Sequence, residues 1–221
     1  FMRIDILTLF PSIINSYLDE SIIKRAIEKE LVNINVINIR DFSPFKSGQV
    51  DDTPYGGGGG MVLMCEPVFK AIDSVKTSDS IVIMTTPAGI KYNQSTAVDL
   101  TKYKHLILLC GHYEGFDERI KTKVDMEISI GDYVLTGGEL ASLVITDSVV
   151  RLLEGVITDT SLESESFTDN LLDYPVYTKP REYEGLKVPD VLLSGDHKKI
   201  NEYRLEERLR ITKEKRPDLL K

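Results

Sequence analysis

The sequence predicts an α/β protein with a mostly parallel central sheet. Two short runs, Ser80–Thr85 and His105–Cys110, are rich in Ile, Val and Leu, which is typical of strands buried on both faces of a parallel sheet. Stretches of helical character alternate with strand-like segments, as in α/β folds. The chain has 221 residues, of which 42% are hydrophobic and 28% charged, so it is long enough to bury a core without disulfides.

The first elements follow from local patterns. Arg3–Thr8 is expected to form a strand, and Pro11 opens a helical stretch that continues to Glu30. Leu31–Arg40 alternates apolar and polar residues with a period of two, which predicts a half-buried strand. Residues 43–60 are rich in Gly, Pro and Asp and are expected to form a long loop.

Helices and strands continue to alternate after this loop. Glu66–Val75 is expected to be a helix with Pro67 in its first turn. Met126–Ile130 is expected to be a further short strand beside the two apolar runs, and Gly138–Leu153 has the strongest helical pattern of the chain.

The pattern changes in the last quarter of the chain. Residues 155–190 are polar, interrupted by prolines and without periodicity, which is typical of a functional segment or a linker. Residues 196–212 return to a basic helical pattern, with Asp196 as the expected N-cap. We therefore predict an α/β domain over residues 1–160, a linker over 161–175 and a small helical domain over 176–221.

Composition excludes several classes of protein. The net charge of −8 argues against indiscriminate nucleic-acid binding, although the last 25 residues carry more basic than acidic side chains. No apolar run approaches the ~20 residues that span a bilayer, and no basic-then-apolar signal opens the chain, so we expect a cytoplasmic protein. Cys65 and Cys110 are too few for a disulfide framework and are expected to be buried free thiols. The three histidines lack metal-ligand spacing, so no metal site is expected.

Each of three apolar strands leads into a loop that contains glycine. These loops are Thr86–Gly89, Gly111–Gly115 and Gly131–Glu139. Ligands bind beyond the carboxyl ends of parallel strands, and glycine allows the backbone to approach a ligand closely. The loops therefore predict one pocket lined by backbone. The alternative is that these glycines only turn strands into helices.

The run Gly56–Gly60 is a less specific signal. Met61 and Val62 follow it instead of the Lys-Ser/Thr of a nucleotide-triphosphate loop, which argues against a phosphate-transferring or nucleotide-hydrolysing enzyme. Five glycines cost backbone entropy unless another group approaches them closely. The sequence allows two interpretations of this run: a loop that contacts a ligand, or a flexible loop without such a role.

Longer segments resemble one known family. The segments PYGGGGGMV, LLCGHYEGFDERI, SIGDYVLTGGELA and SFTDNLLDYPVYTKP resemble the bacterial tRNA (guanine-N1-)-methyltransferases, in the family's order from Met2 to Lys221. These enzymes methylate guanosine 37 of tRNA, next to the anticodon. The resemblance implies a C-terminal trefoil knot that forms the methyl-donor site, an exception to the rule that chains do not thread. It also implies S-adenosylmethionine as cofactor, a homodimer, and the tRNA anticodon stem-loop as substrate.

Methyl transfer to guanine N1 requires two catalytic groups, a general base and a cation. Guanine N1 carries a proton at neutral pH, so a general base must remove it, and a cation stabilises the charge that develops at O6. By resemblance the cation is Arg151, which taken alone is an ordinary charge at a helix end. Glu165 stands where the family has the Asp that acts as base, and Asp173 matches a second family acid that assists. Asp169 is a further candidate; alternatively, these acids only keep the linker solvated.

The resemblance also assigns contacts with the cofactor. Glu114, a carboxylate between glycines, could bind the donor or position the guanine, whereas Tyr113 and Tyr133 could instead be packed in the core. The cofactor set is Thr86, Pro87, Gly89, Gly111, Tyr113, Glu114, Ile130, Gly131, Tyr133, Leu135, Gly137 and Gly138.

Contacts with tRNA are expected from two regions. By resemblance, the first region supplies Asp51, Gly57, Gly58 and Gly59. The expected phosphate contacts, each of which alone is an ordinary surface charge, are Lys179, Arg181, Lys198, Lys199, Arg204 and Arg208. Two other functions remain open: a knotted methyltransferase acting on another RNA base, and a non-catalytic RNA-binding module. The intact loops, together with Arg151 and the linker carboxylate, argue against the second.

Overall fold

The computed structural model describes residues 1–158, 162 and 165–221. The chain forms two compact units, Phe1–Ile157 and Thr158–Lys221, and each is described by itself. The predicted boundary between residues 160 and 161 lies outside the described residues.

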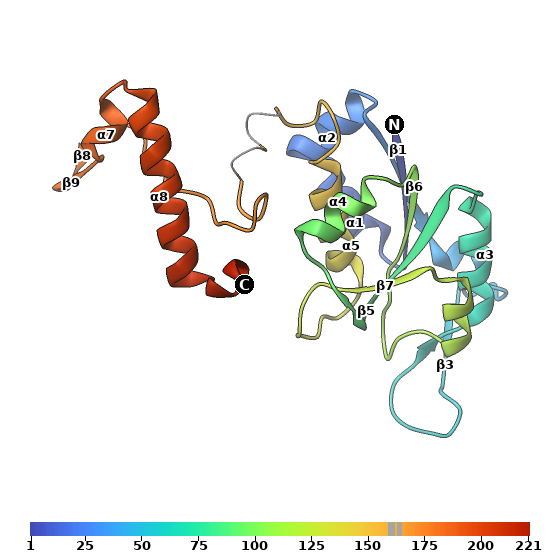
Figure 1. Cartoon of the computed structure of the whole chain (residues 1–221). Helices are drawn as coiled ribbons and strands as arrows, with labels where there is room; N and C mark the ends of the chain where they lie inside the picture. Colours follow the sequence, from blue (N-terminus) through green and yellow to red (C-terminus); the bar gives the residue numbers. More distant parts are fainter. Residues whose placement is uncertain (159–161, 163–164) are drawn as a thin grey trace. The chain divides into compact units, whose positions relative to one another are not determined.

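The first unit is built on a five-stranded sheet with the order β2-β1-β6-β5-β7, in which every pair is parallel (Figure 1). This arrangement confirms the predicted α/β class with a mostly parallel sheet. The strands are β1 (Met2–Thr8), β2 (Val32–Asn38), β5 (Ser80–Lys91), β6 (His105–Leu109) and β7 (Met126–Ser129).

Both faces of this sheet are covered (Figure 1). One face packs against α1 (Pro11–Leu18), α2 (Ser21–Glu28), α4 (Gln94–Leu100) and α5 (Glu139–Val150), and the other against α3 (Cys65–Val75).

The apolar sequence of β6 follows from its burial on both faces of the sheet. Successive side chains of a strand point to opposite faces of its sheet. In β6, Leu106 and Leu108 therefore enter the core under α5, while Ile107 and Leu109 enter the core under α3, and all four are fully buried.

Two elements differ from the sequence-based expectation. The helical stretch from Pro11 to Glu30 is broken into α1 and α2, and Ser21 at the break has a positive φ of 54°. Strand β5 continues to Lys91, although Thr86–Gly89 was expected to be a loop. The strand continues because, beyond a bulge, Ile90 and Lys91 pair with β7 again.

Short elements connect the main strands of the first unit. An antiparallel pair, β3 (Asp51–Asp52) and β4 (Val62–Leu63), holds the two ends of the loop that contains the glycine run. The 3₁₀ helices η1 (Ile39–Phe42) and η2 (Glu118–Lys123) complete the core under α3.

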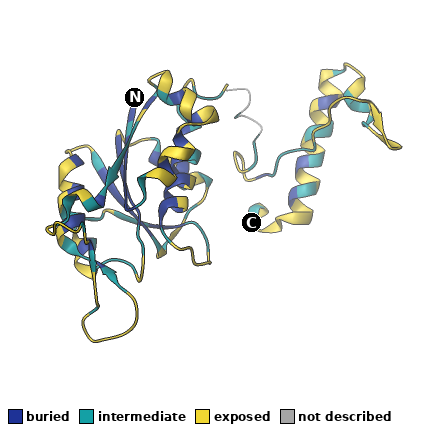
Figure 2. Ribbon diagram, turned by 180° about the vertical axis from the view of Figure 1, so that it is seen from behind, coloured by how far each residue is buried: buried dark blue, intermediate teal, exposed yellow. Residues whose placement is uncertain are grey.

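The second unit contains α8 (His197–Lys215), α7 (Asp190–Leu193), η3 (Pro217–Leu220) and a hairpin of β8 (Glu182–Tyr183) and β9 (Leu186–Lys187). The hairpin lies in a segment that was expected to lack structure. Asp196 caps α8 by accepting a hydrogen bond from the Lys199 N–H at 3.2 Å, which confirms the predicted N-cap. Most of α8 is exposed, and Ile200, Arg208 and Thr212 are buried (Figure 2).

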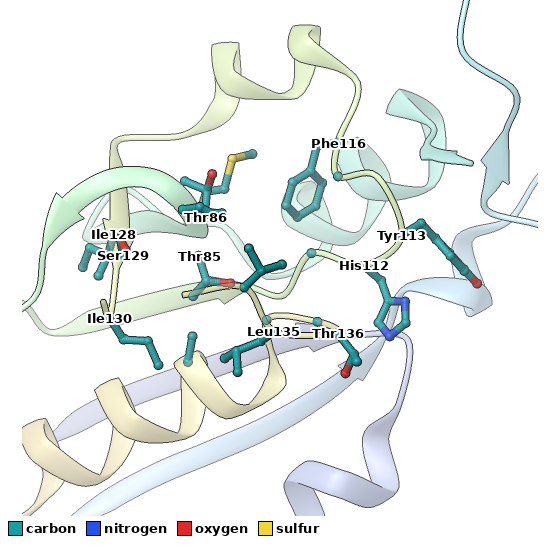
Figure 3. A pocket seen from close by; sticks show the side chains of 18 of the residues that line it. Thr85, Thr86, His112, Tyr113, Phe116, Ile128, Ser129, Ile130, Leu135 and Thr136 are labelled. Carbon is teal, nitrogen blue, oxygen red and sulfur yellow. The ribbon is translucent and has the colours of Figure 1, made fainter. Parts of the chain in front are cut away.

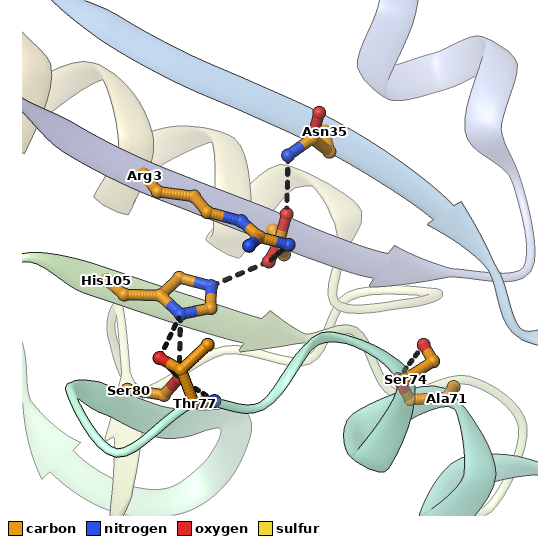
Figure 4. A network of polar contacts seen from close by, with 8 residues as sticks. Arg3, Asn35, Ala71, Ser74, Thr77, Ser80 and His105 are labelled. Carbon is orange, nitrogen blue, oxygen red and sulfur yellow. Dashed lines mark hydrogen bonds and ion pairs between the residues drawn. The ribbon is translucent and has the colours of Figure 1, made fainter.

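A buried polar network ties four strands of the sheet together (Figure 4). The Asp5 carboxylate in β1 is fully buried and accepts a hydrogen bond from Asn35 of β2 at 2.8 Å. Its other oxygen lies 2.6 Å from Nε2 of His105 and 2.9 Å from the Arg3 guanidinium. Nδ1 of His105 lies 2.6 Å from the Ser80 hydroxyl at the start of β5. Both carboxylate oxygens are thus satisfied, as a buried charge requires.

The variant His105→Leu is expected to lower the free energy of unfolding by about 3 kcal/mol, because it removes one partner of a buried carboxylate. Urea denaturation followed by circular dichroism measures this change. Lys102→Ala, which removes only an exposed ion pair with Asp99, is the control and is expected to change stability by less than about 1 kcal/mol. Equal stabilities of the two variants would contradict the role given to the network.

Candidate functional site

A pocket of about 450 Å³ lies against residues 84–87 of β5, beyond the carboxyl ends of β6 and β7, and at the start of α5 (Figure 3). Its volume is within the range of about 300–1,000 Å³ that is usual for small-molecule sites. Its walls are formed by two of the predicted glycine loops, after β6 and after β7, and by residues 84–87, which belong to β5. The pocket brings together every residue of the expected cofactor set except Gly89.

Gly89 has a different position from the rest of that set. A Cβ at this residue would stand 2.5 Å from the carbonyl carbon of Glu127 in β7. The glycine therefore allows β5 to pass close to the backbone of β7 and does not line the pocket.

The loops contact one another through their backbones. The Gly138 N–H donates to the Gly111 carbonyl at 2.8 Å, and His112 pairs with Gly137 in a short antiparallel bridge. A Cβ at Gly138 would stand 2.8 Å from the Gly111 nitrogen, and one at Gly137 would stand 2.6 Å from the His112 ring. If these glycines only turned strands into helices, the two loops would not need to approach each other so closely. The contacts therefore favour the prediction of a pocket lined by backbone.

The chemical character of the pocket is mixed. Its apolar wall is formed by Phe116, Ile128, Ile130, Leu135 and Ala141 (Figure 3). The charged lining residues are Glu114, Glu118 and Lys121, and the Lys121 ammonium lies 3.1 Å from the Glu118 carboxylate. Hydroxyl groups and backbone of the loops complete the polar lining. Such a site can hold a flat ring against the apolar side chains and a cationic group near the Glu114 carboxylate.

Several pocket residues were not predicted from the sequence. Phe116 and Thr136 belong to the same loops as the predicted residues, and Ile128 and Ser129 are the last residues of β7 (Figure 3). Their place at or directly after strand ends was the available signal. The sequence pattern gave no indication of which side chains point into the pocket.

The two pocket tyrosines are not core residues. Tyr113 is 43% exposed and Tyr133 is 55% exposed. The Tyr113 hydroxyl accepts a hydrogen bond from Arg40 at 3.4 Å, and the Tyr133 hydroxyl donates to the Ile130 carbonyl at 3.3 Å. The alternative that these rings are packed in the core is therefore excluded.

Buried groups support the floor of the pocket. Glu139, at the first position of α5, is buried and accepts a hydrogen bond from the Thr8 hydroxyl at 2.8 Å. A carboxylate is favourable at a helix N-terminus. Burial, and secondly the Glu139 charge, raise the pKa of the Cys110 thiol, so this cysteine is an inert buried thiol, as predicted. Cys65 differs from the expectation because it is only partly buried.

The expected catalytic residues lie in both units. Arg151 is the partly buried C-cap of α5 in the first unit. Glu165 and Asp173 are partly buried in the second unit. The Asp173 N–H donates to the Ser166 hydroxyl at 2.9 Å, and its carboxylate accepts from the Tyr174 N–H at 2.7 Å.

Asp169, a candidate base, and Arg208, an expected phosphate contact, are instead paired with each other. They form a two-point ion pair with distances of 2.9 and 2.5 Å, and Arg208 Nε also donates to the Leu172 carbonyl. Arg208 is only 8% exposed, so it is not a surface contact for phosphate in this structure. The hydrogen bonds from Arg208 lower the pKa of Asp169, which makes this carboxylate a poor proton acceptor. The pair instead fastens the preceding segment to α8.

The other residues expected to contact tRNA are more accessible. Lys179, Arg181, Lys198 and Lys199 are exposed, and Lys199 pairs with Asp196 at 3.3 Å. The Arg204 guanidinium lies 4.7 Å from the centre of the Tyr174 ring.

In the first unit, the expected tRNA contacts gather around the glycine loop. Asp51 pairs with Leu63 at the base of this loop. Gly57, Gly58 and Gly59 are exposed, and the described residues leave open space where their Cβ atoms would stand.

The described part of the chain offers neither a metal site nor a membrane-spanning helix. Within residues 1–158, 162 and 165–221, no group of three or more His, Cys, Asp or Glu side chains could hold a metal ion. The helices described there are all too short or too polar to cross a membrane.

The variant Gly138→Ala is expected to disrupt the pocket, because its Cβ would overlap the Gly111 backbone and the Thr85 hydroxyl. Such overpacking lowers the free energy of unfolding by about 1–3 kcal/mol, measurable by urea denaturation. Gly59→Ala is the control for stability, since its Cβ would meet open space among the described residues. A Gly138→Ala protein as stable as this control would contradict the close packing of the loops.

The variant Asp169→Asn is expected to lower the thermal unfolding midpoint of the protein at pH 7. The folded-state pKa of Asp169 is lowered, so its stabilisation is present above its unfolded pKa of about 4 and is lost as the pH falls through the folded value. The difference from wild type should therefore shrink below about pH 4. The control in the same pH series is Glu202→Gln, which changes an exposed residue of α8, the helix that carries Arg208. A difference that is constant with pH would contradict the ion-pair role.

Comparison with known proteins gives a consistent result over the whole chain. A family model described as tRNA (Guanine-1)-methyltransferase TrmD matches residues 2–221. A protein of Mycoplasma capricolum is 58% identical over 99% of this chain and 92% of its own length. One of Clostridioides difficile is 57% identical over 100% of this chain and 98% of its own, and one of Malacoplasma penetrans is 56% identical over 99% and 96%. All three relatives are named tRNA (guanine-N(1)-)-methyltransferase.

Proposed function

This chain belongs to the tRNA (guanine-1)-methyltransferase family, and from that premise we propose that it transfers a methyl group from S-adenosylmethionine to N1 of guanosine 37 in tRNA. The observation that carries the assignment to this chain is the pocket formed by residues 84–87 of β5 and by the glycine loops that follow β6 and β7.

The pocket suits S-adenosylmethionine in shape and charge. Its apolar wall can hold the adenine ring, and loop backbone groups can bind the polar edge of that ring and the ribose. The Glu114 carboxylate can attract the donor's positive charge, whereas the Glu118 carboxylate at the same pocket is paired with Lys121 at 3.1 Å. When bound, the donor supplies an electrophilic methyl group.

The contacts between the loops support the proposed trefoil knot. Thr85 of β5, Gly111 after β6 and Gly138 before α5 come from three separate segments, yet Gly138 packs against both the Thr85 side chain and the Gly111 backbone. A chain threaded through its own loop needs glycine where the segments touch, because a side chain there would hold them apart.

We assign the proton transfer to the second unit. Glu165 accepts the guanine N1 proton, and Asp173 assists it. Asp169 is not assigned this role because Arg208 occupies both of its carboxylate oxygens and lowers its pKa, which weakens it as a proton acceptor. The Arg151 guanidinium stabilises the negative charge that develops at guanine O6.

A homodimer fits an exposed apolar face of the first unit. Ile13 and Tyr17 of α1 and Leu140 and Val144 of α5 are exposed, although large apolar side chains on a surface are more usual where a partner covers them. Their neighbour Ala141 lines the pocket, so this face begins beside the proposed donor site. We propose a second copy of this chain as the partner that covers it.

The exposed basic residues of the second unit suit the tRNA. Lys179, Arg181 and Lys198 present positive charge that can contact phosphates of the anticodon stem-loop. Recognition of a base in a folded loop requires that the base is splayed out of its stack.

The direct experiment is incubation of the purified protein with a labelled methyl donor and an unmodified tRNA transcript, followed by mapping of the product. Label is expected at guanosine 37, and a transcript with adenosine at that position is the control. Label at another nucleotide would move the assignment to another RNA base, and no transfer to any transcript would overturn the proposal.

The variant Arg151→Ala is expected to lower the methyl-transfer rate by at least about a hundredfold, the scale of losing one group that stabilises developing charge. Donor affinity, measured by titration calorimetry, should change little because this residue acts on the guanine. Loss of donor binding would contradict the assigned role.

The variant Glu165→Gln keeps the side-chain shape but removes the base, so a loss of about 10²–10⁴-fold in transfer rate is expected. Single-turnover kinetics with saturating tRNA isolates this step from binding. The matched variant is Asp173→Asn, which should cost less. Turnover near the wild-type rate for Glu165→Gln, with a large loss for Asp173→Asn, would move the base to Asp173.

A further inference from the structure

The end of the glycine run is joined to the pocket loop that carries Glu114. The Glu114 N–H donates to the Met61 carbonyl at 3.0 Å, and the Leu63 N–H donates to the Gly115 carbonyl at 3.0 Å. A third bond, also of 3.0 Å, runs from the Asp117 N–H to the Leu63 carbonyl. Residues 61–63, which directly follow the run, therefore lie along the loop that forms one wall of the pocket.

Gly60 differs from the other glycines of the run. A Cβ at Gly60 would stand 2.5 Å from Oε1 and 2.8 Å from Cδ of Glu114. At Gly57, Gly58 and Gly59 a Cβ would meet open space among the described residues. The Glu114 side chain thus lies across the bare backbone of Gly60, in space that any other residue would fill.

The same segment is fixed at its other side. Leu63 pairs with Asp51 in the short β3–β4 ladder, and the Met64 N–H donates to the Val50 carbonyl at 2.8 Å. Both ends of the glycine loop are therefore anchored.

We propose that Gly60 is a positioning residue that sets the direction of the Glu114 carboxylate at the donor pocket. The contact also links the exposed glycine loop to donor binding, because a ligand that shifts this loop would change the affinity of the pocket, and the donor would shift the loop in return. The inference rests on the proposed function, since it takes the ligand of the pocket to be S-adenosylmethionine.

A simpler role for Gly60 is that its φ of +81° requires glycine for the turn alone. Gly48 separates the two roles. It has a φ of +76°, and the described residues leave open space around its Cβ position. Gly48→Ala therefore carries the same backbone strain as Gly60→Ala without the contact with Glu114.

The test is a double-mutant cycle on donor affinity, measured by titration calorimetry with S-adenosylmethionine. Gly60→Ala is expected to weaken binding by at least about tenfold, the scale of one hydrogen bond to a charged group. Gly48→Ala should stay within about twofold. In a protein that already carries Glu114→Ala, the further change Gly60→Ala should cost almost nothing, because the side chain that it displaces is absent.

The opposite results would overturn the inference. An unchanged affinity for Gly60→Ala, or the same loss with and without Glu114, would mean that Gly60 does not act through the carboxylate. Wild-type protein that binds no S-adenosylmethionine would instead overturn the proposed function.

The contact can also be tested without the donor. Thermal unfolding midpoints of the same variants measure it, because Gly60→Ala should destabilise the protein less when Glu114 is already Ala. Equal destabilisation in both backgrounds would contradict the contact itself, even if Gly60→Ala proved too unstable for calorimetry.

Discussion

The close backbone approach of two loops beside β5 is the constraint on which the site depends. The Gly138 amide reaches the Gly111 carbonyl only because no side chain separates the two segments, and Thr85 of β5 occupies the space beside them. This contact joins the end of β6 to the start of α5, next to β5. The pocket walls are therefore held in place by their packing against the central sheet. Walls fixed in this way are pre-organised for a ligand.

The fold was predictable where a single physical requirement determined the sequence. A strand buried on both faces is expected to be almost entirely apolar, and Leu106 to Leu109 meet this requirement, so the place of β6 in the sheet could be inferred. The return of β5 to β7 at Ile90 depends on a partner strand that is distant in sequence. The break before Ser21 depends on one backbone conformation, and no local pattern predicted it.

The candidate site was predictable to a similar extent. Strand-end glycines and the family resemblance together indicated the pocket walls, and the structure gathers these residues. The burial and the ion-pair partner of a single charged side chain could not be predicted, because they depend on residues that are distant in the sequence. Arg208 is an example: its neighbours in sequence suggest a surface cation, but its ion pair with Asp169 buries it.

The carboxylates of the first unit show how one type of group serves two purposes. Asp5 and Glu139 are buried with their hydrogen bonds satisfied by neighbouring strands, so their charges stabilise the sheet and the floor of the pocket. Glu114 is exposed, and its side chain lies against the bare backbone of Gly60. An exposed carboxylate at the edge of a pocket can attract a cationic ligand. Its direction depends on the shape of the surface beneath it, and this is why a residue without a side chain, Gly60, can matter to the chemistry of the pocket.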